Sequence, residues 1–137
     1  VIDCFATDHA SHTVEEKRGA NPPPGFPGLE QALAVWLTCA HAGQLTIEDI
    51  VLRMRTNPAR IFGGPAGQPA DEGTHIEVDT DEEWVVHAER QFTKAGWTPY
   101  AGLTLRGRVT KTVLRGVVAY DGEEVLGPKG LGKEVGL

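Results

Sequence analysis

VIDCFATDHASH, residues 1–12, joins an apolar run to a cluster of polar side chains within a dozen positions. Residues 1–7 are almost continuously apolar apart from Asp3, which is the pattern of a strand covered on both faces, as in a parallel sheet. Asp8 stands at the carboxyl end of that run, and His9 and His12 follow it. The stretch therefore predicts a buried parallel strand with a carboxylate and two imidazoles at its end.

The segment after this strand indicates a long ordered loop and then a helix. Residues 8–28 are polar and rich in proline and glycine, and PPPGFPG at 22–28 has too few N–H donors for a helix or a central strand. Apolar residues then recur at helical spacing from Leu29 to Ala40, and Gly43 stands where a C-terminal cap is expected.

A second helix and several short strands are predicted farther along the chain. Thr46 begins a T-x-x-D capping box, and an Asn-Pro pair at 57–58 restarts a helical turn that ends near Gly63. After a linker-like stretch at 63–73, β-type segments occupy residues 76–78, 84–87, 108–114, 117–120 and 125–126. The Asp-Gly pair at 121–122, between the last two segments, is a strong hairpin signal.

A single parallel strand has no partner in this sequence. A chain that began at Val1 would also place a charged amino group at the head of a buried strand, at a desolvation cost of several kcal/mol. We therefore expect the 137 residues to be the C-terminal part of a larger α/β enzyme. In parallel α/β barrels the catalytic groups lie at the carboxyl ends of strands, which is where Asp8 falls.

Composition narrows the class of protein. The chain is 40% hydrophobic with a net charge of −6, as expected of an ordinary globular chain with one modest core. It has no apolar stretch near the roughly 18 residues that span a bilayer, and no signal peptide, so we expect no membrane contact and a cytoplasmic location. The acidic balance argues against nucleic acid as a partner and favours a small molecule. Cys4 and Cys39 form no C-x-x-C motif, which indicates buried free thiols.

Asp8, His9 and His12 allow several interpretations on pattern alone. An aspartate at a strand end ligates a metal, shuttles a proton, or caps a turn by accepting backbone N–H bonds, and the pattern by itself favours the cap. A loop histidine such as His12 commonly bonds a carbonyl group, and His9 is expected to point away and brace the loop. The three side chains also allow a small metal site, although D-H-x-x-H is a weaker signal than H-E-x-x-H on a helix.

Several longer stretches resemble the dihydroorotase family. ATDHASHTVEEK at 6–17, followed by NPPPGFPGLE at 21–30, resembles its last-strand and loop region, most closely in the dihydroorotase domains of animal multifunctional pyrimidine-synthesis proteins. TNPARIFG at 56–63 and the stretch 92–122 resemble the family's return to a small β-sandwich. Hydantoinases and allantoinases share the barrel, the aspartate and the W-x-P-x-x-G ending, but PGFPGLE favours dihydroorotase.

The resemblance implies an α/β fold, namely the C-terminal part of a TIM-like (β/α)8 amidohydrolase barrel plus a small β-sandwich module. Residues 1–65 would hold the last strand, the active-site loop and helices of the barrel. Residues 66–137 would form the β-sandwich module and tail, separate from the barrel and without a catalytic group.

The resemblance also implies roles for single residues. Asp8 matches the aspartate that ligates the more exposed zinc ion and acts as general base and acid. His12 matches the histidine that binds the substrate carboxylate. Pro24 and Gly25 match the loop that meets the pyrimidine ring through backbone groups, and Ala10 is a weaker contact candidate.

Two departures from the family pattern bear on this site. Ser11 stands where the family usually has proline, which would loosen the turn between Asp8 and His12. The strand-borne H-x-H, the carboxylated lysine and the two further histidines of the family's binuclear Zn²⁺ centre do not occur in this chain. A complete centre would therefore need residues from outside the sequence.

The implied activity is the zinc-dependent, reversible cyclisation of N-carbamoyl-L-aspartate to L-dihydroorotate in pyrimidine biosynthesis. The implied partners are this small-molecule substrate, the missing N-terminal barrel portion, and either an aspartate transcarbamoylase or a second copy of the protein. Two alternatives remain open: a related cyclic amidohydrolase of hydantoinase or allantoinase type, and a non-catalytic dihydroorotase-like subunit kept for assembly.

Overall fold

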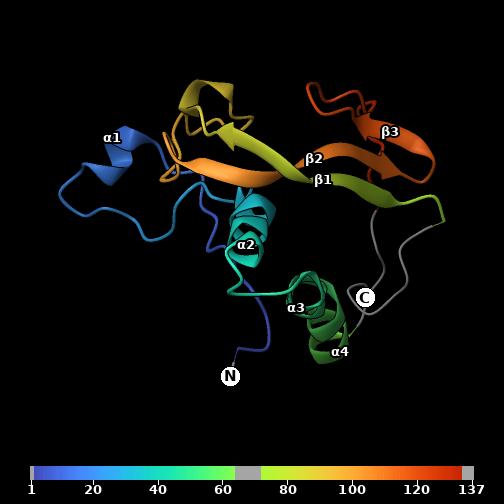
Figure 1. The fold of residues 1–137 in the computed structure, drawn as a ribbon. Helices are drawn as coiled ribbons and strands as arrows, with labels where there is room; N and C mark the ends of the chain where they lie inside the picture. Colours follow the sequence, from blue (N-terminus) through green and yellow to red (C-terminus); the bar gives the residue numbers. More distant parts are fainter. Residues whose placement is uncertain (1, 64–71, 134–137) are drawn as a thin grey trace.

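The computed structural model describes residues 2–63 and 72–133. Three layers follow one another in Figure 1: an antiparallel sheet, helix α2 beneath it, and a helical rod beneath α2. The short helix α1 (Val14–Lys17) lies beside one end of the sheet, on the loop that follows the N-terminal segment. Within the described ranges, no helix is long and apolar enough to cross a membrane.

Helix α2 (Ala32–His41) confirms the helical spacing and the predicted stop. Its buried side chains are those of Ala32, Ala34 and Leu37. Gly43 has a φ of 72°, and its N–H bonds the carbonyl of Ala40 while the next N–H, of Gln44, bonds that of Cys39. These two bonds make the Schellman cap for which a glycine is favoured.

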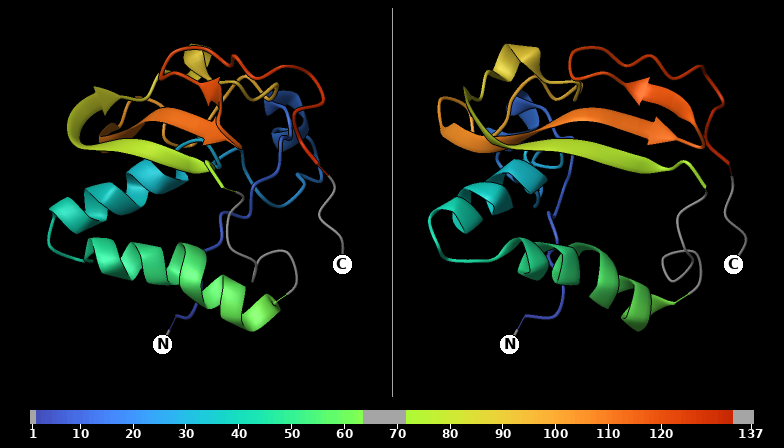
Figure 2. Two further views of the ribbon diagram at one scale, coloured as in Figure 1. Left: turned by 90° about the vertical axis from the view of Figure 1, so that its right-hand side faces the viewer. Right: turned by 45° about the vertical axis from the view of Figure 1, so that its right-hand side comes forward.

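The predicted second helix is a continuous rod in three parts, seen from two sides in Figure 2. Helix α3 (Ile47–Val51) begins with the predicted capping box, in which Thr46 and Asp49 bond each other's backbone N–H. A π-helical turn, η1 (Leu52–Thr56), leads into α4 (Asn57–Phe62), with proline in its first turn. The Asn-Pro pair thus continues the rod rather than starting a separate element.

Three antiparallel strands form one sheet in the order β1-β2-β3: β1 (His75–Val85), β2 (Thr104–Leu114) and β3 (Val117–Tyr120). The predicted segments 76–78 and 84–87 were wrongly separated, because β1 contains the first of them and residues 84–85 of the second. A register shift between Asp79 and Glu83 accommodates the intervening polar residues without ending the strand. Segment 125–126 forms only an isolated bridge to Tyr120.

The main hairpin turn lies at Arg115 and Gly116, which the sequence prediction missed. Their φ angles of 51° and 77° suit a two-residue turn of the kind that matches strand twist. The predicted reversal at Asp121 is present as well, because its carboxylate accepts the N–H groups of Glu123 and Glu124. The chain therefore reverses at both points.

Residues 2–7 form no strand within the described chain, and Val1 lies outside the described residues. The strand at residues 1–7 was predicted to pair with neighbours from outside this sequence, so it stays a prediction. A strand requires a ladder of backbone hydrogen bonds to a neighbour. Within the described residues, this segment contacts helices and not a strand. The Phe5 N–H bonds the carbonyl of Arg53 at 3.2 Å, and the ring of Phe5 stacks on that of Trp36 with centroids 3.9 Å apart.

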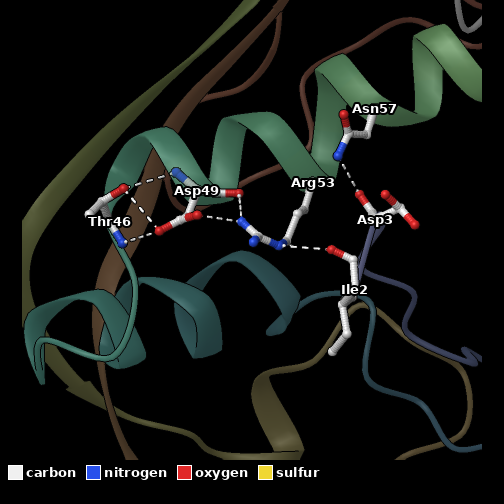
Figure 3. A network of polar contacts seen from close by, with 6 residues as sticks. All are labelled: Ile2, Asp3, Thr46, Asp49, Arg53 and Asn57. Atoms are coloured by element: carbon white, nitrogen blue, oxygen red, sulfur yellow. Dashed lines mark hydrogen bonds and ion pairs between the residues drawn. The ribbon is translucent and has the colours of Figure 1, made fainter.

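Side chains of the rod hold the start of this segment, as Figure 3 shows. Arg53 Nε donates to the carbonyl of Ile2 at 3.2 Å, while its Nη1 donates to Asp49 at 2.5 Å. Asn57 is buried and donates to the carbonyl of Asp3 at 2.7 Å. The segment before Asp8 is thus fixed to the rod.

A single apolar core joins α2 to the sheet. Ala34, Val86 and Leu105 are its buried members, and Val35, Trp84 and Tyr100 pack around them. Side chains from both the helical segment and the β segment therefore contribute to this core. The described strands make one sheet, so a second sandwich layer and the division at 65/66 stay predictions. Cys4 and Cys39 are free and half-buried rather than fully buried.

Candidate functional site

The loop after the N-terminal segment brings three of the predicted site residues together: Asp8, Ala10 and Gly25. Residues 9 and 26 form a parallel bridge, in which Ala10 N–H bonds the carbonyl of Phe26 at 3.0 Å and Phe26 N–H bonds that of Asp8 at 3.4 Å. The proline-rich loop is therefore hydrogen-bonded directly against the D-H-A tripeptide.

Gly25 is required at this contact for two reasons. Its φ of +79° lies in the left-handed region, which disfavours other residues. A Cβ at this position would lie 2.7 Å from Ala10 Cβ and 2.8 Å from the Asp8 carbonyl oxygen. The Asp8 Oδ2 atom would be 3.7 Å away, so the Gly25 backbone lies against the carboxylate. Pro24, next to Gly25, is exposed.

Asp8 is exposed and has a φ of 49°, an uncommon value that aspartate tolerates better than most residues. None of the described residues donates a hydrogen bond to its carboxylate, whereas a capping aspartate would accept backbone N–H groups. The cap interpretation is therefore wrong for the described part of the chain. The left-handed backbone directs a free carboxylate toward the surface beside Gly25.

His9 braces the loop, as predicted. Its Nδ1 accepts the N–H of Leu29 at 3.2 Å, and its Nε2 lies 3.1 Å from the Ser11 hydroxyl. Because Nδ1 accepts, the proton of the neutral ring is assigned to Nε2, which donates to Ser11. The serine at the position where proline was expected thus gains a contact with His9.

His12 precedes Thr13, the N-cap residue of α1. Its backbone carbonyl accepts the indole N–H of Trp97 at 2.8 Å, and its Nδ1 is 3.6 Å from Oε2 of Glu16. A hydrogen bond from the Thr13 backbone, aided by His12, holds the pKa of Glu16 below its ordinary value. Nε2 of His12 has no partner among the described residues, so this nitrogen is available to a ligand.

Two features of this region were missed from the sequence. Thr13 and Glu16 form a capping box that starts α1, and the T-x-x-E spacing was a usable signal for it. Lys17, at the end of α1, donates to the carbonyls of Pro23 and Gly25 at 2.5 and 2.7 Å. No sequence pattern pointed to this long-range contact.

The segment at residues 91–100 lies outside the strands and makes hydrogen bonds to residues 12, 30 and 31. The Glu30 carboxylate accepts the N–H groups of Phe92 and Thr93 at 3.0 and 2.8 Å. Gln31 is 2% exposed and accepts the Thr98 hydroxyl at 3.0 Å. Together with the indole of Trp97, these bonds hold the W-x-P segment on the His12 side of the site.

The described residues do not form a metal centre by themselves. No group of three or more His, Cys, Asp or Glu side chains converges in the parts of the chain that the structure describes. His9 is engaged with Leu29 and Ser11, so Asp8, His9 and His12 do not converge as a three-residue site in the described chain. Asp8 alone supplies one carboxylate, which is fewer ligands than a catalytic zinc ion requires.

A hollow of the surface lies elsewhere. It has a volume of about 580 Å³ and lies between α2 and the sheet, where Leu33, Trp84, Phe92 and Tyr120 are among its lining residues. Asp8, His12 and Gly25 do not line it. The cluster of Asp8, His12 and Gly25 therefore lies on the surface, outside this hollow.

Comparison with known proteins finds relatives along nearly the whole chain. The chain is 51% identical over 135 residues to multifunctional protein CAD of Squalus acanthias, covering 98% of this chain and 6% of that protein. It is 44% identical over 135 residues to the dihydroorotase of Pyrococcus horikoshii, covering 94% of this chain and 31% of that enzyme. The chain is homologous to the dihydroorotases. No family model matches it.

Solved structures extend the relationship to hydantoinases. The D-hydantoinase (dihydropyrimidinase) from Thermus sp. superposes with a TM-score of 0.86 at 26% identity, over 98% of this chain and 31% of that one. The inactive dihydroorotase-like domain of the Chaetomium thermophilum CAD-like multifunctional protein gives a TM-score of 0.62 at 27% identity, over 82% of this chain and 30% of that one. This dihydroorotase homologue therefore has an amidohydrolase-type fold and spans less than a third of the relatives named here.

Proposed function

We propose that this chain is the C-terminal part of a dihydroorotase that interconverts N-carbamoyl-L-aspartate and L-dihydroorotate in cytoplasmic pyrimidine synthesis. The observation that carries the proposal is 51% identity over 98% of the chain to a multifunctional protein, with dihydroorotases at 44% identity beside it. The rest of the barrel, in this proposal, supplies the sheet neighbour of residues 2–7 and covers the open side of the site.

Asp8 acts in the proposed reaction as the proton shuttle. In the hydrolytic direction its carboxylate takes a proton from the attacking water and delivers it to the departing amide nitrogen. Its exposure and its lack of a hydrogen-bond donor among the described residues support this role, because both leave the oxygens free to accept a proton. Binding to zinc would use the same carboxylate, but the remaining ligands must come from elsewhere in the protein. Asp8 is the one residue here that we assign to a zinc centre.

His12 and the proline-rich loop hold the substrate. Nε2 of His12 is free for the substrate carboxylate, while Nδ1 lies 3.6 Å from Oε2 of Glu16. The backbone of Pro24 and Gly25 meets the ring, and Ala10 lies against Gly25 from the other side. This arrangement supports a substrate held between the loop and His12, with Asp8 at the reacting bond.

The hydantoinase-type alternative is supported by the structural match to the Thermus enzyme. The matched pair of substrates that separates it from a dihydroorotase is L-dihydroorotate and dihydrouracil, which differ in the ring carboxylate alone. The non-catalytic alternative is supported by the match to an inactive dihydroorotase-like domain. It predicts no turnover of either compound.

The test is steady-state hydrolysis of both compounds by the complete protein that contains this chain, supplied with zinc. We expect kcat/KM for L-dihydroorotate to exceed that for dihydrouracil by at least about 100-fold, because a site built to bind a charged group rejects an analogue that lacks it. Preference for dihydrouracil would favour the hydantoinase type. Zinc-loaded, folded protein without any turnover would favour the assembly subunit.

The partner proposal follows from the same relatives. Two of them are named multifunctional proteins, from Squalus acanthias and Dictyostelium discoideum, and each is 51% identical to this chain. We infer that an aspartate transcarbamoylase, on the same polypeptide or bound to it, or a second copy of the protein, accompanies the enzyme. Mass measurement of the native complex distinguishes these arrangements.

A further inference from the structure

We propose that Lys17 is a positioning residue that fixes the proline-rich loop, residues 22–28, over Asp8. Its Nζ donates to the Pro23 carbonyl at 2.5 Å and to the Gly25 carbonyl at 2.7 Å. These two carbonyls flank Pro24, so one ammonium group holds the loop on both sides of that residue. The consequence for substrate binding rests on the proposed dihydroorotase function, but the contact itself does not.

The proline-rich loop needs a hydrogen-bond donor from another part of the chain, because it has few backbone N–H groups of its own. Four of the seven residues in PPPGFPG are proline and carry no backbone N–H. One of the remaining donors, the Phe26 N–H, is already used on the Asp8 carbonyl at 3.4 Å. A lysine ammonium offers three donors and a full charge, and charge-assisted bonds of this kind are stronger than neutral ones. Lys17 therefore provides a strong restraint on a loop that cannot make a backbone ladder.

Lys17 is itself held in a fixed position. It ends α1, where its N–H bonds the Thr13 carbonyl at 3.1 Å, and the capping box between Thr13 and Glu16 holds the start of the same turn. A positive side chain at a helix end also complements the exposed carbonyls there. Because α1 directly follows His12, Lys17 sets the spacing between His12 and the Gly25 backbone, the two sides of the proposed substrate site.

The experiment uses Lys17→Met and Lys17→Arg in the complete protein, with Arg18→Met as the matched control. Arg18 is the next residue, is exposed, and makes no side-chain hydrogen bond to the described residues, so its replacement removes the same charge without the contact. For Lys17→Met we expect KM for L-dihydroorotate to rise about tenfold and kcat to fall less than about threefold, because ring positioning is lost while Asp8 is retained. Lys17→Arg keeps the donors and is expected to restore most of the loss.

A second readout does not depend on activity. Backbone amide exchange in the peptide that covers residues 22–28 is expected to become at least about tenfold faster in Lys17→Met and to stay unchanged in Arg18→Met. If Lys17→Met fails to fold, the kinetic and the exchange measurements are made on Lys17→Gln instead. Unchanged KM together with unchanged exchange would overturn the proposal, and so would a loss of kcat alone. If the wild-type protein shows no dihydroorotase activity, the proposed function fails, while the exchange result still decides the role of Lys17.

Discussion

Replacing Gly25 by alanine tests the contact that brings the loop to Asp8. The alanine would keep a left-handed φ of +79°, at a cost of about 1 kcal/mol relative to glycine. Its Cβ would also lie 2.7 Å from Ala10 Cβ and 2.8 Å from the Asp8 carbonyl oxygen, so the loop must move away. Overpacking of this kind costs about 1–3 kcal/mol. We expect Gly25→Ala to lower the free energy of unfolding by about 2–4 kcal/mol in total.

Gly43→Ala is the matched control for this variant. Gly43 has a similar φ of +72°, but no heavy atom lies within 4 Å of the position its Cβ would take. Gly43→Ala should therefore lower the free energy of unfolding only by the conformational part of the cost, about 1 kcal/mol. Urea unfolding of both variants in the complete protein gives the difference between them. Because a displacement of about 1 Å in a positioned group can cost about 100-fold in rate, kcat/KM for L-dihydroorotate should fall in Gly25→Ala and not in Gly43→Ala.

Equal losses of stability in the two variants, with activity retained in both, would refute this reasoning. That result would mean that the close approach of Gly25 to Ala10 is relieved at no cost, and that the loop does not need this position for the site to work.

Three further predictions concern other parts of the chain. His12→Ala should raise KM for L-dihydroorotate and leave turnover of dihydrouracil almost unchanged, because the lost contact is to the carboxylate; loss of zinc with normal KM would contradict this. Gly107→Ala should destabilise the protein by about 2–4 kcal/mol in urea unfolding, because its φ is +88° and its Cβ would lie 2.5 Å from Leu37 Cδ1. The hydrogen bond from Arg53 lowers the pKa of Asp49, so this carboxylate stabilises the fold above its unfolded pKa and ceases to do so as pH falls through its folded pKa. The Tm difference between wild type and Asp49→Asn should therefore shrink below about pH 4, and a difference that grew in acid would be inconsistent with the ion pair.

Local signals in the sequence were reliable where a few neighbouring residues decide the conformation. Gly43 ends α2 because a left-handed residue completes the Schellman cap, and Thr46 with Asp49 begins α3 by satisfying backbone N–H groups. The role of His9 as a brace was also predicted from its position next to Asp8.

Contacts between distant residues were not predictable in the same way. The strand expected at residues 1–7 has an apolar pattern but no partner in the described chain, and a strand exists only with one. The polar run inside β1 suggested a loop, yet a register shift absorbs it within the strand. Lys17 reaches Pro23 and Gly25 through a side chain whose direction depends on α1, and no periodicity in the sequence encodes that direction.

Of the two capping boxes, the one at Thr46 was predicted from the sequence and the one at Thr13 was missed. The box at Thr46 was found because a long apolar pattern follows it, whereas the box at Thr13 begins a helix of four residues with no apolar face. This helix buries no side chain. Short helices of this kind are stabilised by their caps and by tertiary contacts, so hydrophobic periodicity does not detect them.

The turnover number of Asp8→Asn in the complete, zinc-loaded protein tests the central claim most directly. Asparagine keeps the size of the side chain and one oxygen but does not accept the proton of the attacking water. The account predicts that kcat for L-dihydroorotate hydrolysis falls by at least about 100-fold while the protein stays folded. A variant that kept near-normal kcat would contradict the account, because the free carboxylate at the end of residues 2–8 would then have no part in the reaction.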